Sequence, residues 1–227
     1  MNIISNKLGY WAALLITVTF ISWIFLFVAI LITSPMFIWT NFSDFLKYYN
    51  DNNQLLQNTA KIFMLFFGSL FVILINSFLD ISNDNYKALA RLSLIFAVSF
   101  AILSSLHYFV QISNVRINLN TGNSEGLQNF IQANPTSFSS AMNMLGWTLF
   151  LGLSSIFISP FFSGNRLNII IKIAFIANGI SCFIAGFGYL LQIDFITFLF
   201  INIGVGGSIL TISFSSIKFF KQRIKNI

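Results

Sequence analysis

The residue types best suited to chemistry lie within one long apolar segment. Ser104, His107, Gln111 and Asn114 recur there at spacings that place them on one face of a helix, and Arg116 follows them. His107 is the only histidine of the chain. Because a polar group turned towards lipid would lose its hydrogen bonds, this face is expected to point to the interior of a helical bundle, where it suits ligand binding. A lone buried histidine that only makes structural hydrogen bonds is the alternative.

Other apolar segments carry polar residues that are expected to join the same face of the bundle. The predicted ligand-binding set is His107, Gln111, Arg116, Asn143, Asn178 and Gln192. The smaller polar stripes are interpreted as helix-packing surfaces, because small residues let membrane helices approach closely. These stripes are Thr148, Gly152, Ser155 and Ser159 in one segment, and Asn202 and Gly206 in another.

The sequence assigns no catalytic residue, no metal site and no cofactor. With one histidine and one glutamate, Glu125, an H-E-x-x-H zinc site is impossible, and no phosphate-binding loop or nucleophile elbow is present. The apolar segments contain no pair of carboxylates. An enzyme acting through Ser104 and His107 stays open as a minor alternative.

The composition predicts an integral membrane protein. The 227 residues are 56% hydrophobic and 8% charged, whereas soluble domains carry about 25% charged residues. A membrane helix needs roughly 20 apolar residues. Six segments qualify, so we expect an all-α bundle that forms a single transmembrane domain over residues 1–227, with spans at about 8–32, 62–79, 92–112, 141–162, 167–191 and 195–217. The first span is too long for a cleaved signal peptide and is expected to be retained.

The basic residues predict the orientation. Nine lie at one end of the predicted bundle and three at the other, which places both termini in the cytoplasm by the positive-inside rule. The nine are Lys7, Lys87, Arg91, Arg166, Lys172, Lys218, Lys221, Arg223 and Lys225, and the three are Lys47, Lys61 and Arg116. The net charge of +6 is thus explained by basic residues that set the orientation in the membrane. No nucleic-acid partner is expected.

Two long outer loops are predicted at residues 33–61 and 113–140. The first contains an aromatic stretch from Phe37 to Tyr49 with helical periodicity, which is typical of a helix lying in the membrane interface. In the second, a short helix is expected near residues 124–132, with Ser124 as its cap. We expect this second loop to cover a small outward-facing cavity, and the opposite charges of Arg116 and Glu125 could pair there.

Residues 105–190 resemble an uncharacterised family of bacterial polytopic membrane proteins. The resemblance rests on His107-Tyr108-Phe109-Val110-Gln111, Val115-Arg116, Glu125-Gly126-Leu127, Asn134-Pro135, Leu145-Gly146-Trp147, Ser159-Pro160-Phe161-Phe162, Ile176-Ala177-Asn178-Gly179 and Gly188-Tyr189. It implies a helical bundle of about six spans in a bacterial plasma membrane, and it implies no catalytic residue.

These patterns favour a protein that binds a small amphipathic or lipid-like molecule in an outward-facing cavity without covalent chemistry. The lipid bilayer and such a molecule are then its expected partners. Two alternatives remain: an accessory or immunity-type subunit that contacts another membrane protein, and a small-solute transporter or its substrate-binding subunit.

Overall fold

The computed structural model describes residues 3–35 and 37–226, and these form an all-α bundle. Six helical segments are long and apolar enough to cross a membrane, which confirms the predicted number. They are Ile3–Thr33, Leu55–Asp80, Asp84–Thr121, Phe138–Phe161, Arg166–Leu190 and Asp194–Lys225. The third extends nine residues beyond its predicted end at residue 112, so the second outer loop is shorter than expected.

Three of the six segments change their helical type along their length. The third consists of α4 (Asp84–Val110), the π-helical turn η1 (Gln111–Val115) and α5 (Arg116–Thr121). The fourth consists of α6 (Phe138–Leu145), the π turn η3 (Gly146–Phe150), α7 (Leu151–Ile158) and a short 3-10 turn η4 (Ser159–Phe161). The sixth consists of α9 (Asp194–Leu199), the π turn η5 (Phe200–Val205) and α10 (Gly206–Lys225).

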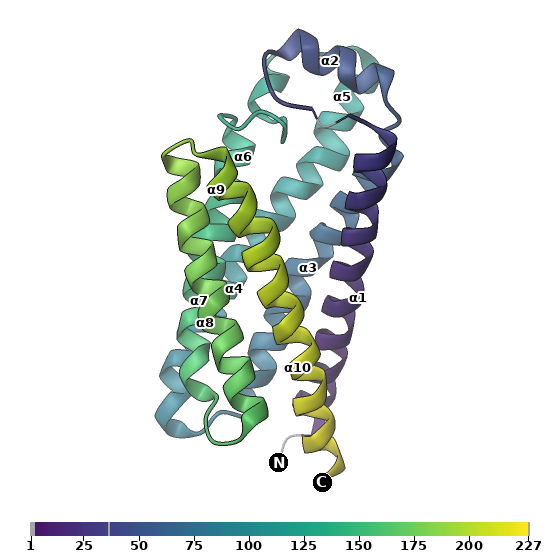
Figure 1. The fold of residues 1–227 in the computed structure, drawn as a ribbon. Helices are drawn as coiled ribbons and strands as arrows, with labels where there is room; N and C mark the ends of the chain where they lie inside the picture. Colours follow the sequence, from purple (N-terminus) through teal and green to yellow (C-terminus); the bar gives the residue numbers. More distant parts are fainter. Residues whose placement is uncertain (1–2, 36, 227) are drawn as a thin grey trace.

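The spanning helices form a closed ring. Helix α1 (Ile3–Thr33) packs on α3 (Leu55–Asp80), α3 on α4, α4 on α7, α7 on α8 (Arg166–Leu190), α8 on α10, and α10 returns to α1. Both chain ends lie at the same end of the bundle (Figure 1). We call this the terminal end, and the opposite end, which carries α2 (Phe42–Asp51), the distal end.

An aromatic core closes the terminal end. The ring of Phe78 stacks on Phe220 at a centroid distance of 5.0 Å, and the ring of Phe162 stacks on Phe175 at 5.6 Å. All four side chains are fully buried. Offset and edge-to-face ring pairs of this kind add to the burial of apolar area, so this end of the bundle is densely packed.

Interhelical hydrogen bonds hold the middle of the bundle. Ser93 Oγ on α4 donates to Ser154 O at 2.7 Å, and Asn178 Nδ2 on α8 donates to Ser155 Oγ at 2.8 Å. Ser208 Oγ on α10 in turn donates to the Oδ1 atom of Asn178 at 2.9 Å. These bonds use small polar residues, as expected for packing between membrane helices.

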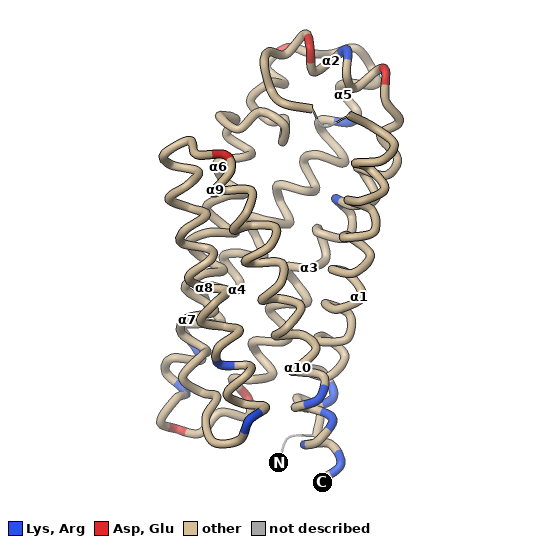
Figure 2. The backbone as a smooth tube through the Cα atoms, in the orientation of Figure 1, with Lys and Arg blue, Asp and Glu red and all other residues tan. Residues whose placement is uncertain are grey.

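Basic residues gather at the terminal end. Figure 2 shows most Lys and Arg positions near the chain ends and the neighbouring helix connections, with few near α2 and α5. The structure thus brings the predicted cytoplasmic group of basic residues to one end of the bundle.

The distal end is covered by two chain segments. Asn41 caps α2 by accepting a hydrogen bond from the Asp44 backbone amide, so the predicted aromatic helix of the first outer loop begins only at Phe42 and leaves residues 37–41 outside it. The expected helix at 124–132 is reduced to a turn and one 3-10 turn, η2 (Leu127–Asn129). Gly122 and Gly126 both have positive φ angles, which interrupt a continuous helix there.

Candidate functional site

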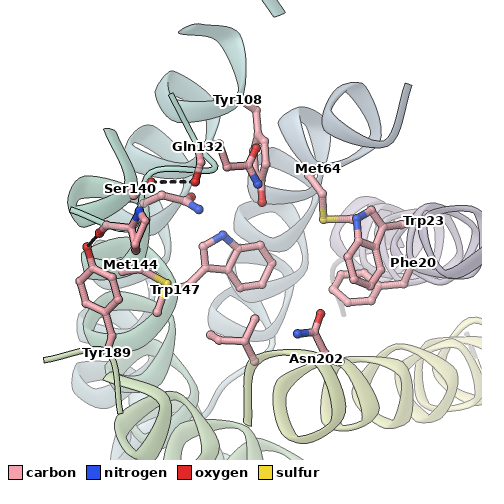
Figure 3. Close-up of a pocket in the computed structure, with 14 residues that line it drawn as sticks. Phe20, Trp23, Met64, Tyr108, Gln132, Ser140, Met144, Trp147, Tyr189 and Asn202 are labelled. Atoms are coloured by element: carbon pink, nitrogen blue, oxygen red, sulfur yellow. Dashed lines mark hydrogen bonds between the residues drawn. The ribbon is translucent and has the colours of Figure 1, made fainter. Parts of the chain in front are cut away.

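Two adjoining cavities occupy the distal half of the bundle. Their volumes are about 300 Å³ and 440 Å³. They share five lining residues, namely Trp23, Met64, Tyr108, Gln132 and Asn202. Figure 3 shows these side chains around the first cavity, with Trp147 in their midst. The shared walls make the two cavities neighbouring parts of one site.

The π turns supply part of the cavity walls. Gln111 and Val115 of η1 line the second cavity, Trp147 of η3 lines the first, and Asn202 of η5 lines both. A π turn inserts an additional residue into an α-helix and changes the direction of the side chains that follow it, and such turns are frequent at functional sites. The widened helices therefore coincide with the place where the bundle is hollow.

Polar atoms without partners border the first cavity. Asn143 Oδ1 and Trp147 Nε1 are buried and have no hydrogen-bond partner among the described residues, although the hydroxyl of Tyr108 lies near both. In Figure 3 the indole nitrogen of Trp147 lies on the side of Tyr108. Since buried polar groups are nearly always hydrogen-bonded, such atoms beside a cavity mark positions where a bound molecule or water would be stabilised.

The second cavity carries positive charge. Lys61 and Arg116 both line it, and none of its described lining residues is acidic. Lys61 is surrounded by protein atoms but keeps partial access because it faces the cavity, and it has no ion pair with a described residue. Arg116 is exposed and likewise unpaired, so the expected pairing with Glu125 is absent from the described structure. The cavity therefore presents two cations without a protein counter-ion.

Aromatic residues of α2 form a lid over the second cavity. Phe45 packs with Val115, Leu127 and Ile131 into a small hydrophobic core that is separate from the main core. This core joins the first outer loop to the second. The predicted role of the second loop as a cover is supported, since Ile131, Gln132 and Ala133 line the cavity beneath it.

Two tyrosines of α2 also line the second cavity. Tyr48 accepts a hydrogen bond from Gln57 Nε2 at 3.1 Å, and Tyr49 donates to Asn120 Oδ1 at 3.3 Å. Burial raises the pKa of both phenols above the usual value of 10.0, so both stay neutral at physiological pH. They can therefore offer O–H groups to a bound molecule without adding negative charge.

Gln111 fastens the second outer loop, and His107 contacts Ser139 in the first turn of α6 directly after it. Gln111 Nε2 donates to the carbonyl of Phe130, and its Oε1 atom accepts from the Gln132 backbone amide at 3.0 Å. His107 Nδ1 lies 2.8 Å from Ser139 Oγ and 3.0 Å from Ser139 O. The Nε2 atom of His107 is buried without a hydrogen-bond partner, although the side chain of Gln132 lies near it.

The structure places four of the six predicted site residues at or beside the distal cavities. Gln111 and Arg116 line the second cavity, Asn143 lines the first, and His107 lies beside them. Asn178 instead joins the interhelical hydrogen bonds in the middle of the bundle. Gln192 is exposed in the turn between α8 and α9, with a φ angle of 56°.

Sequence reasoning missed several lining residues. Lys61 was counted only as a topological charge, although a lysine beside an apolar run is itself a signal for an intramembrane site. Asn202 and Gly206 were assigned to helix packing, yet both line the first cavity. Tyr108 and Trp147 entered only through the resemblance, because aromatic residues are common in membrane helices. The described residues contain no group of three or more His, Cys, Asp or Glu side chains that could hold a metal ion.

Comparisons with protein-family models, with curated proteins and with solved structures found no match for this chain. No family is thus identified for the resemblance over residues 105–190. The six long apolar helices by themselves support a multi-span helical membrane protein.

Proposed function

We propose that this protein binds a small amphipathic molecule in the distal cavities without transforming it. The observation that carries the proposal is the pair of adjoining cavities, whose apolar walls also carry the unpartnered polar atoms of Asn143 and Trp147. Ligand sites are typically apolar concavities of about 300–1,000 Å³ with a few convergent polar groups, and both cavities fit this description.

A cavity-filling substitution tests the proposal with a close control. Gly206 lines the first cavity, and a Cβ atom added there meets nothing within 4 Å, so Gly206→Leu fills the cavity without a clash at the backbone. Gly207 has the same freedom but is exposed on the outside of the helix and lines neither cavity. Gly207→Leu is therefore a matched control on the same helix.

The probe is the set of host-membrane molecules that remain bound during mild extraction in a neutral detergent. Native mass spectrometry is expected to show a stoichiometric small-molecule adduct on the unmodified protein and on Gly207→Leu, and to show its loss from Gly206→Leu. Equal occupancy in all three proteins would contradict the proposal. A stoichiometric protein partner in place of a small molecule would instead favour the accessory-subunit alternative.

The proposed orientation places the terminal end in the cytoplasm, so the cavities open to the outer side of a bacterial plasma membrane. The excess of basic residues at the terminal end supports it. A membrane-impermeant maleimide on intact cells tests it, since the natural thiol of Cys182 is buried. We expect Asn53→Cys to be labelled and Ser163→Cys to be protected, and the reverse pattern would overturn the orientation.

A further inference from the structure

The charge and shape of the second cavity narrow the class of ligand. We infer that the bound molecule is an anionic lipid of the adjacent leaflet, with its headgroup between Lys61 and Arg116 and its acyl chain leaving the bundle between α1 and the α9–η5 segment. This inference rests on the proposed function and specifies the ligand.

The two cations define the headgroup. Lys61 and Arg116 line one cavity, neither has an ion pair with a described residue, and the described lining offers no carboxylate. An anion held in this cavity would be attracted by both cations and would meet no carboxylate in the described lining. A guanidinium binds phosphate oxygens through two parallel hydrogen bonds, and an ammonium binds them as a point charge. Tyr48, a neutral phenol in the same lining, adds a possible donor.

The depth of Lys61 agrees with a lipid headgroup. Lys61 lies six residues after Leu55, where α3 begins, which corresponds to roughly 9 Å along the helix axis. The interfacial layer on each side of a bilayer is several ångströms thick, because the hydrocarbon core is about 30 Å and the whole bilayer about 40–45 Å. With the start of α3 at the outer edge of the headgroup layer, Lys61 would lie near the boundary between headgroups and acyl chains.

The acyl chain has an apolar path to the bilayer. Helices α1 and α10 are in contact towards the terminal end, where Thr17 Oγ1 donates to Ser213 Oγ at 2.9 Å. Towards the distal end the two segments diverge (Figure 1). Phe27 of α1 and Phe198 of α9 both line the second cavity there, and Phe198 is 43% exposed. The cavity is thus bordered by apolar side chains on both sides of the divergence, which suits a chain that lies partly in the bundle and partly in lipid.

Lipid binding by the full-length protein tests the inference. In a neutral detergent, native mass spectrometry would compare phosphatidylglycerol, phosphatidylcholine and diacylglycerol with identical long acyl chains. We expect phosphatidylglycerol to bind about tenfold more tightly than the other two. Lys61→Met and Arg116→Gln should each reduce this preference by about threefold or more, while Lys61→Arg, which keeps the charge, should retain it. Lys47→Gln removes an exposed charge of α2 that lines neither cavity and should leave the preference unchanged.

The anionic headgroup, the acyl path and the proposed function are each contradicted by a different result. Equal binding of the three lipids, or an unchanged preference in both Lys61→Met and Arg116→Gln, would overturn the anionic headgroup but leave the proposed function in place. Equal binding of a dihexanoyl phosphatidylglycerol, or displacement of the long-chain lipid by inorganic phosphate, would overturn the acyl path and indicate a soluble anion as the ligand. If no lipid binds and Gly206→Leu changes no adduct, the proposed function fails with it.

Discussion

The terminal and distal halves of this bundle are built from similar residues but pack in opposite ways. In the terminal half, fully buried rings such as Phe78 and Phe220 stack across helices. In the distal half, Trp23, Tyr108 and Trp147 surround cavities. Composition alone therefore does not decide where a membrane bundle is dense, and the path of each helix matters as much as its side chains.

Buried polar atoms without a described partner occur in both halves, for example Ser216 Oγ in the terminal half, but Asn143 and Trp147 in the distal half border a cavity. In the middle of the bundle, Asn178 is paired with serines on both neighbouring helices. At the distal cavities, Asn143 Oδ1 and Trp147 Nε1 remain unpartnered. Leaving such atoms unpaired lowers stability, and proteins tolerate that loss mainly where a site requires it. The cavity beside these atoms supports the proposal that the distal half binds the ligand.

The largest expected effect is the loss of a ring from the terminal core. Phe78→Ala removes a fully buried ring that contacts several other phenylalanines, and we expect a loss of about 3–5 kcal/mol in the free energy of unfolding. Phe27→Ala makes the same change at the wall of a cavity, where the half-buried ring stacks on Trp23, so it should lose only about 0.5–1.5 kcal/mol. Reversible unfolding in mixed micelles measures both values. Similar losses would remove the proposed contrast between the halves.

A smaller effect is expected at the close approach of α3 and α4. A Cβ atom on Gly68 would lie 2.8 Å from the Cα atom of Ala101, so Gly68→Ala must push two backbones apart. We expect a destabilisation of about 1–3 kcal/mol, the usual range for overpacking. Gly207→Ala, which meets nothing within 4 Å, serves as the control. If thermal unfolding of the two variants coincides, α3 and α4 are not packed as tightly as described.

Paired and unpaired amides should respond differently to replacement. Asn178→Leu removes hydrogen bonds to Ser155 and Ser208, which in membrane helices are worth about 0.6–1.7 kcal/mol. Asn202 bonds only the backbone of its own helix, through Phe198 O, so Asn202→Leu should change stability by less than about 0.5 kcal/mol. The same unfolding assay compares them, and a larger loss in Asn202→Leu would contradict this account.

The smallest effect on global stability is expected at His107 and Gln111. His107→Leu combined with Gln111→Leu removes the side-chain bonds to Phe130, Gln132 and Ser139. The second outer loop should then exchange its backbone amide hydrogens faster, while the aromatic core near Phe78 keeps its protection. Hydrogen-exchange mass spectrometry resolves the two regions. Unchanged exchange in residues 122–137 would show that other contacts hold the loop.

The sequence was sufficient for the all-α fold and the number of spans. Those features follow from runs of apolar residues and from turn-forming residues, which act locally. The site was harder to predict, because residues were assigned to the buried face of each span by regular α-helical spacing. Asn114 was expected to share a buried face with Gln111, yet Asn114 is exposed and Val115 is buried, since the π turn η1 shifts the register between them.

Lys61 illustrates a second reason for the incomplete prediction. Its role depends on Arg116, a residue that lies on another helix and far away in sequence, and on the absence of an acidic neighbour in the described cavity lining. Such a relationship exists only after the helices have assembled. Hydropathy and residue spacing describe one segment at a time. They therefore assign Lys61 only the role of a charge that sets membrane orientation.

The π turns affect how changes of sequence during evolution alter the interior of this bundle. Because an α-helix advances about 100° per residue, regular α-helical winding of the same residues Gly146–Phe150, with none deleted, would rotate α6 by roughly that angle relative to α7. Asn143 would then swing away from the cavity although every side chain kept its identity. Changes that convert these π turns to regular α winding without removing a residue are thus a route by which related chains could gain or lose a hollow interior.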